Sequence, residues 1–96
     1  MTMIPQVRQM LSPKSNNPVA NQFIVTTPEA IFFQSYRTVI AQIDRKTGQV
    51  TLDVTYWNYS RTTAKYRNIF LNENTAETRR KLRNCEYKLD YLNQLP

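Results

Sequence analysis

The chain is predicted to fold as one α+β domain: an antiparallel sheet of three to four strands, two short helices packed on one face, and an extended N-terminal arm. Three observations support this prediction. Apolar and polar residues alternate over residues 39–44 and 50–57, which is the period of half-buried strands. Over residues 60–85, apolar residues follow helical spacing instead. The length of 96 residues is that of a single small domain.

The first residues differ in composition from the remainder of the chain. Residues 1–21 hold three prolines among serines and asparagines. Ile4, Val7 and Leu11 lie at helical spacing, but the prolines that bound this stretch would keep such a helix short. We therefore expect residues 1–21 to form a flexible arm or, alternatively, an arm that docks on a partner or a second copy. Residues 22–96 are expected to form the α+β domain.

The strands are predicted from β-branched and aromatic runs. Residues 23–27 and 30–36 are such runs, and Pro28 separates them. The alternating residues 39–44 and 50–57 follow. We expect these runs to pair as neighbours in an antiparallel sheet.

The segment between the two alternating runs has the composition of a hairpin loop. Asp44 can accept backbone N–H groups at the start of a turn. Gly48 is the only glycine of the chain and can adopt the left-handed conformation that the exit requires. We expect a loop over residues 44–49, with Arg45 and Lys46 exposed at its tip.

Two helices are predicted after the strands. Ser60 is a favourable N-cap for a helix over residues 61–72. Asn74 opens a second helix, and Glu77 three residues later has the spacing of a capping box. Asn84 can adopt the left-handed conformation that ends this second helix.

Alternation resumes over residues 86–91, so we expect a last strand that returns to pair with the sheet. The core is expected to combine the apolar faces of these strands and helices, and to be adequate but thin for a chain of this length. Its predicted members are Phe23, Val25, Phe33, Val39, Ala41, Ile43, Val50, Leu52, Val54, Tyr66, Ile69, Phe70, Leu82 and Leu89.

The residue types that are rare in the chain exclude most kinds of catalytic site. There is no histidine, one cysteine and one glycine. The commonest general base, zinc sites and glycine-rich phosphate loops are therefore excluded. The seven acidic residues form no cluster suited to a divalent cation. We expect a protein that is not an enzyme, with no catalytic residues, no metal and no cofactor.

The sequence shows no apolar run long enough to cross a membrane and no secretory signal. A single cysteine fits a reducing compartment. We expect a protein of the cytoplasm that does not associate with membranes.

Positive charge is concentrated in the two predicted helices. The formal net charge is +6, and residues 61–83 hold seven cations and two acids. An exposed basic face of this kind can neutralise phosphates without reading sequence, although it can also serve only to keep a small protein soluble. The predicted nucleic-acid-binding residues are Arg61, Lys65, Arg67, Arg79, Arg80, Lys81 and Arg83.

Aromatic residues precede this basic segment. Trp57 lies on the opposite strand face from Val54 and Tyr56, and Tyr59 follows it. Trp57 and Tyr59 are candidates for stacking on bases or for anchoring a protein interface. The alternative is that they hold the junction between strand and helix in place.

A longer motif surrounds these aromatics. Residues 56–67 read Tyr-Trp-Asn-Tyr-Ser-Arg-Thr-Thr-Ala-Lys-Tyr-Arg, and Phe70-Leu71 follow. Over residues 26–93 the chain resembles a family of short proteins of bacteriophages and mobile elements that has no assigned activity. Members often carry a glycine in the turn before the last strand, where this chain has Asn84 and Cys85. The resemblance implies an accessory protein made by a phage in the host bacterial cytoplasm.

These observations leave three functional hypotheses. The first is a phage-type accessory protein that binds the phosphate backbone of nucleic acid. The second is an inhibitor of a host protein or ribonucleoprotein, such as an anti-CRISPR or other anti-defence or host-takeover protein. The third is a minor component of the virion. A homodimer formed by strand addition at an open sheet edge is a further alternative.

Overall fold

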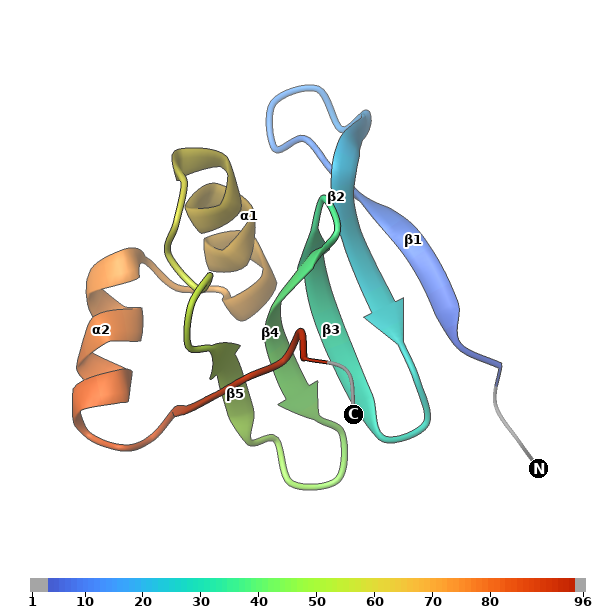
Figure 1. Ribbon diagram of the computed structural model, residues 1–96. Helices are drawn as coiled ribbons and strands as arrows, with labels where there is room; N and C mark the ends of the chain where they lie inside the picture. The colour runs from blue at the N-terminus through green and yellow to red at the C-terminus, as the bar shows by residue number, and fades with distance from the viewer. Residues whose placement is uncertain (1–3, 95–96) are drawn as a thin grey trace.

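A computed structural model describes residues 4–94, which form a mixed six-stranded sheet and two helices (Figure 1). The α+β class is therefore confirmed. The elements in chain order are β1 (Gln6–Leu11), β2 (Pro18–Thr26), β3 (Ala30–Ser35), β4 (Thr38–Asp44), β5 (Val50–Asp53), α1 (Arg61–Leu71), α2 (Thr75–Arg83) and β6 (Lys88–Asp90). Neither helix is long and apolar enough to cross a membrane.

The strands lie in the sheet in the same order as in the chain. The first five pair antiparallel, but β6 pairs parallel to β5, with Leu52 opposite Leu89. The prediction of three to four antiparallel strands is thus corrected to six strands in a mixed sheet. The cause is the connection: α1 and α2 carry the chain back to the starting end of β5, so β6 runs in the same direction.

Residues 6–21 belong to the sheet and do not form a separate arm. β1 pairs with β2 from Gln6 opposite Thr26 to Gln9 opposite Phe23. The turn between them closes with Ser12 N–H donating to the Asn17 carbonyl at 2.8 Å. The predicted boundary at residue 22 therefore falls inside β2. Composition suggested an arm because the prolines and asparagines of residues 13–18 build the turn of this hairpin. Residues 1–3 of the predicted arm lie outside the described residues.

A bulge in β4 changes which side chains face the core. Phe33 pairs with Ala41 and Gln34 with Val39, so Ile40 is an extra residue without a partner. Ile40 and Ala41 are both fully buried, whereas Val39 is half-buried. Strict alternation predicted Val39 in place of Ile40. The bulge breaks that alternation because it inserts one residue into the strand.

The core lies between the sheet and α1, which packs across β3 and β4. The Phe33 and Phe70 rings stand 5.9 Å apart, and the buried hydroxyls of Ser35 and Thr63 are 3.1 Å apart. The core prediction is confirmed for five buried residues: Phe33, Ala41, Val50, Leu52 and Tyr66. It is wrong for three residues that are exposed: Val54, Ile69 and Leu89. It missed three buried residues: Met10, Ala30 and Ile40.

The predicted loop at Asp44–Gly48 and the predicted N-cap at Ser60 are both present in the structure. Asp44 Oδ1 accepts the N–H groups of Lys46 and Thr47 at 2.9 Å each, and Gly48 has φ 78°. These backbone hydrogen bonds lower the pKa of the Asp44 carboxyl. The Ser60 hydroxyl accepts Thr63 N–H at 3.1 Å.

The second helix begins as predicted and ends one residue away from the predicted cap. Asn74 and Glu77 form the reciprocal capping box. At the other end, Asn84 has φ −88°, and Cys85 takes the left-handed conformation with φ 59°. Glu86 N–H donates to the Lys81 carbonyl at 2.9 Å, which closes the helix end around Cys85.

Candidate nucleic-acid interface

The junction between β5 and α1 brings the candidate residues together. Asp53 ends β5 with only 2% of its surface exposed, and its Oδ2 accepts the N–H groups of Thr55 and Tyr56 at 3.0 and 2.9 Å. These bonds turn the chain out of the sheet and toward the N-cap Ser60. The aromatic residues of the junction are therefore held beside the first turn of α1.

Arg67 is buried rather than part of an exposed basic face, which corrects the predicted binding set. Its Nη1 donates to the Trp57 carbonyl at 2.7 Å and to Asn58 Oδ1 at 3.0 Å. Its Nη2 donates to Asn68 Oδ1 and Thr75 Oγ1, both at 2.8 Å. The guanidinium forms no ion pair within residues 4–94. Burial lowers the pKa of Arg67, and the charge of Glu73 opposes this shift only in part. The Nε atom of the guanidinium is buried and has no hydrogen-bond partner among the described residues.

The structural role of Arg67 left a signal in the sequence. Arg67 lies four residues after Thr63 and three before Phe70, and those two side chains face the core. Helical spacing alone therefore places position 67 on the inner face of α1. The charge of arginine argued for the outside, but four neutral acceptors satisfy its Nη1 and Nη2 groups in the interior.

Lys81 also has an internal partner. Its Nζ donates to Glu73 Oε1 at 2.8 Å, and the Glu73 side chain is only 2% exposed. Thr78 and Tyr87 donate their hydroxyl protons to the same carboxylate, at 2.5 and 2.6 Å. The charge of Lys81 is thus neutralised within this cluster of four side chains, which reduces what it contributes to a binding face.

The cluster shifts the pKa values of its members. Burial opposes ionisation of Glu73, but the hydrogen bonds from Lys81, Thr78 and Tyr87 outweigh it and lower the pKa of that carboxyl. The same hydrogen bond raises the pKa of Lys81. Burial, with the hydrogen bond to Glu73, raises the pKa of the Tyr87 phenol to about 12.

Five of the predicted cations remain on the surface of α1 and α2: Arg61, Lys65, Arg79, Arg80 and Arg83. Arg80 approaches Glu86 at 3.8 Å, and both side chains are about half exposed. The other four form no ion pair with any residue that the structure describes. Their charges are therefore available to solvent and to an anionic partner.

Trp57 lies between the buried Arg67 and the exposed Arg79. The guanidinium carbons of Arg67 and Arg79 lie 5.2 and 5.4 Å from the centroid of the Trp57 ring. Trp57 is half-buried against the core, so it holds the junction in place. Tyr59 is 48% exposed and meets the ring of Tyr56 edge to face at 5.5 Å.

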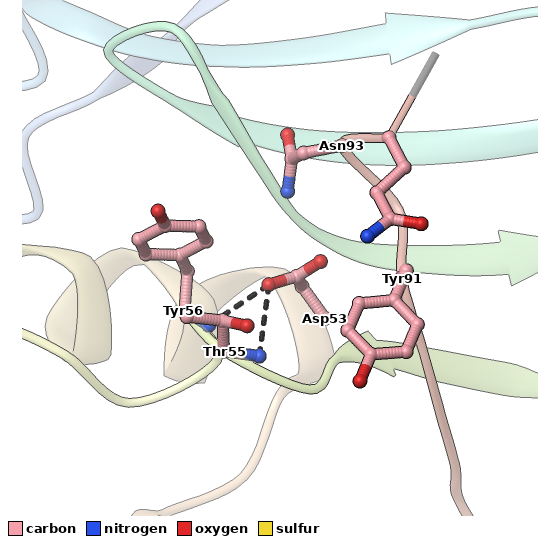
Figure 2. Close-up of a pocket in the computed structure, with 6 residues that line it drawn as sticks. Asp53, Thr55, Tyr56, Tyr91 and Asn93 are labelled. Atoms are coloured by element: carbon pink, nitrogen blue, oxygen red, sulfur yellow. Dashed lines mark hydrogen bonds between the residues drawn. The ribbon is translucent and has the colours of Figure 1, made fainter. Parts of the chain in front are cut away.

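A pocket of about 250 Å³ opens beside this junction (Figure 2). Its lining comes from the junction and from the end of the chain: Asp53, Thr55, Tyr56, Tyr91, Asn93 and Gln94. Figure 2 shows the Asp53 carboxylate between the rings of Tyr56 and Tyr91. No local sequence pattern predicts this pocket, because its two walls, residues 53–56 and 91–94, lie far apart in the chain.

Two polar contacts fix the C-terminal wall of the pocket. Leu92 N–H donates to Asp53 Oδ1 at 2.9 Å. The Asn93 amide accepts from Val39 N–H at 2.7 Å and donates to the Val39 carbonyl at 2.9 Å. Because β5 ends at Asp53, the Asn93 side chain takes the place of a strand residue beside Val39.

Within residues 4–94, no group of three or more side chains is placed to hold a metal ion. Comparison with protein families finds a match over residues 6–86 to a family of unknown function, DUF8033. No curated protein and no solved structure matches the chain significantly.

Proposed function

We propose that this chain, which belongs to the DUF8033 family, is a small non-enzymatic protein that binds the phosphate backbone of nucleic acid. One observation carries the proposal: four exposed cations on two neighbouring helices have no acidic partner among residues 4–94. The binding set is accordingly revised to Arg61, Lys65, Arg79, Arg80 and Arg83. Arg67 and Lys81 support the face from inside and do not contact the ligand.

Such a face favours binding without sequence readout. Each cation that meets a phosphate releases a condensed counterion, and this release drives association. The helices are 11 and 9 residues long. The recognised DNA-binding helix arrangements are absent from the sequence, so base edges in a duplex groove are not expected to be read.

A salt titration tests the proposal. Binding to generic single- and double-stranded DNA and RNA is measured by fluorescence anisotropy across a range of salt. If all five cations contact phosphates of duplex DNA, the log–log slope should approach about −4.5. Binding that is absent at the lowest salt would overturn the proposal.

Charge reversal locates the binding face. Arg79→Glu with Arg83→Glu should weaken binding and reduce the slope to about −3, because two phosphate contacts are lost. The matched control is Arg8→Glu with Lys14→Glu, which changes the net charge equally on the exposed β1–β2 hairpin. An equal loss in both variants would show that net charge alone attracts the ligand, and circular dichroism should show both variants folded.

We also propose where the protein originates and acts. The motif of residues 56–71 favours a phage-encoded accessory protein that acts in a bacterial cytoplasm. If nucleic acid does not bind, the alternative that we propose is an inhibitor of a host protein. β1 is an edge strand whose side chains Val7 and Leu11 are exposed, so it can receive a strand from a partner.

A further inference from the structure

We propose that the pocket between the β5–α1 junction and the C-terminal segment holds one unstacked base of single-stranded nucleic acid. This inference rests on the proposed function and specifies the ligand that the basic face attracts.

The dimensions of the pocket suit a single ring system. Its volume of about 250 Å³ lies below the ~300–1,000 Å³ typical of sites for drug-sized molecules. Tyr56 and Tyr91 are 39% and 60% exposed, so both rings leave aromatic surface in water. Aromatic rings of this kind are the usual stacking platforms for bases of single strands, since every base offers a π face.

The carboxylate in the pocket selects against a phosphate. Asp53 Oδ2 already accepts two backbone N–H groups and Oδ1 accepts one, so Oδ1 retains the capacity to accept another hydrogen bond. A carboxylate repels phosphate but accepts the amino protons of a base edge, as acidic side chains do from cytosine. The pocket should therefore prefer bases that carry an exocyclic amino group over uracil or thymine.

The pocket lies close in the chain to the first cation of α1, Arg61. The Tyr56 ring contacts the Tyr59 ring, and Tyr59 is two residues before Arg61. A strand whose base enters the pocket can therefore follow the junction toward Arg61 at the start of α1. In a duplex the bases are paired and stacked inside the helix, so they cannot enter.

The walls of the pocket are held before any ligand arrives. The Asp53 carboxylate accepts backbone N–H groups from the junction and from Leu92. The Asn93 side chain is hydrogen-bonded to the backbone of Val39 in β4. Binding therefore costs little ordering of the protein backbone, and the Tyr91 ring is the part that adapts.

The experiment compares strands that carry the same phosphates but differ in their bases. Short single-stranded oligonucleotides of cytosine, of thymine and of abasic sites, with a duplex of equal length, are titrated at one salt concentration. The wild-type protein should bind the cytosine strand about 5- to 150-fold more tightly than the abasic strand, which is the range of one stacked base. The thymine strand should lie between them.

Tyr91→Asn should remove most of this preference while binding to the duplex stays unchanged. The matched control is Tyr36→Asn, which removes a tyrosine that is 52% exposed, at a left-handed position (φ 57°) that asparagine tolerates. That variant should bind every probe as the wild type does.

The outcomes separate this inference from the proposed function. Equal binding of cytosine and abasic strands, with a steep salt dependence, would overturn the base pocket and leave the basic face intact. An equal loss of duplex and single-strand binding in Tyr91→Asn would also overturn it. Absence of binding to every probe would overturn both proposals.

Discussion

At the scale of single residues, the two arginines beside Trp57 have opposite roles although both carry the same charge. Arg67 is fully buried, and its four hydrogen bonds join the junction, α1 and α2. Arg79 lies exposed near the same ring. Burial gives Arg67 a structural role, whereas exposure leaves the charge of Arg79 available to the proposed ligand.

Arg67→Met should destabilise the protein by about 2–4 kcal/mol. The substitution removes hydrogen bonds from a buried charged group and leaves the Trp57 carbonyl and neighbouring oxygens without a donor. Urea unfolding measures this loss. Arg79→Met, the matched control, should change stability by less than about 1 kcal/mol and weaken nucleic-acid binding instead. A neutral effect of Arg67→Met on stability would contradict the structural role.

Glu73 should make the protein sensitive to acid. Its pKa in the folded state lies below the ordinary value of 4.5, so its contribution to stability is complete above that pH. As the pH falls, the unfolded chain binds a proton at Glu73 before the folded protein does, and the free energy of unfolding decreases.

The melting temperature of wild-type protein should therefore fall between neutral pH and pH 3 more steeply than that of Glu73→Gln. The variant should also be less stable at neutral pH, because Lys81 loses its partner. Glu86→Gln removes an exposed carboxylate at the long Arg80 contact and should keep the wild-type slope. If the melting temperatures of wild type and Glu73→Gln fell in parallel with pH, the proposed acid sensitivity of the Glu73 cluster would be disproved.

At the scale of elements, each helix ends on a left-handed residue. Asn72 closes α1 with φ 56°, and Cys85 closes α2 with φ 59°. Asparagine tolerates this conformation, but the Cβ of cysteine makes it unfavourable. The cap of α2 is therefore the weaker of the two.

Cys85→Gly should stabilise the protein by about 1 kcal/mol, because glycine adopts this conformation without strain. Cys85 is exposed, so little packing is lost. Asn84→Gly is the control: Asn84 has φ −88°, where glycine only adds freedom to the unfolded chain, so stability should fall. Thermal unfolding compares the two variants, and a destabilised Cys85→Gly would contradict the strained cap.

At the scale of the whole molecule, the sheet sets the geometry of the candidate site. β5 is only four residues long, and its early end leaves room for the C-terminal segment beside β4. The parallel return of β6 brings Tyr91 next to Tyr56. The pocket thus lies at the end of β5, beside the junction that leads into α1.

The sequence by itself determined the features that depend on neighbours in the chain. The Gly48 turn, the Ser60 cap and the Asn74 capping box each need only a few consecutive residues, and their chemistry is legible in the residue types. The same holds for the exclusion of the common catalytic motifs and for the basic composition of the helices.

Only the tertiary structure decided what depends on distant partners. Residues 6–11 form a strand because they pair with β2. Ile40 is buried because the bulge in β4 inserts it as an extra residue between the partners of Phe33 and Gln34. Arg67 is interior because its oxygen partners come from the junction and both helices. The pocket exists because residues 53–56 and 91–94 meet in space. Backbone pairing and burial act between segments far apart in the chain, so local patterns do not contain them.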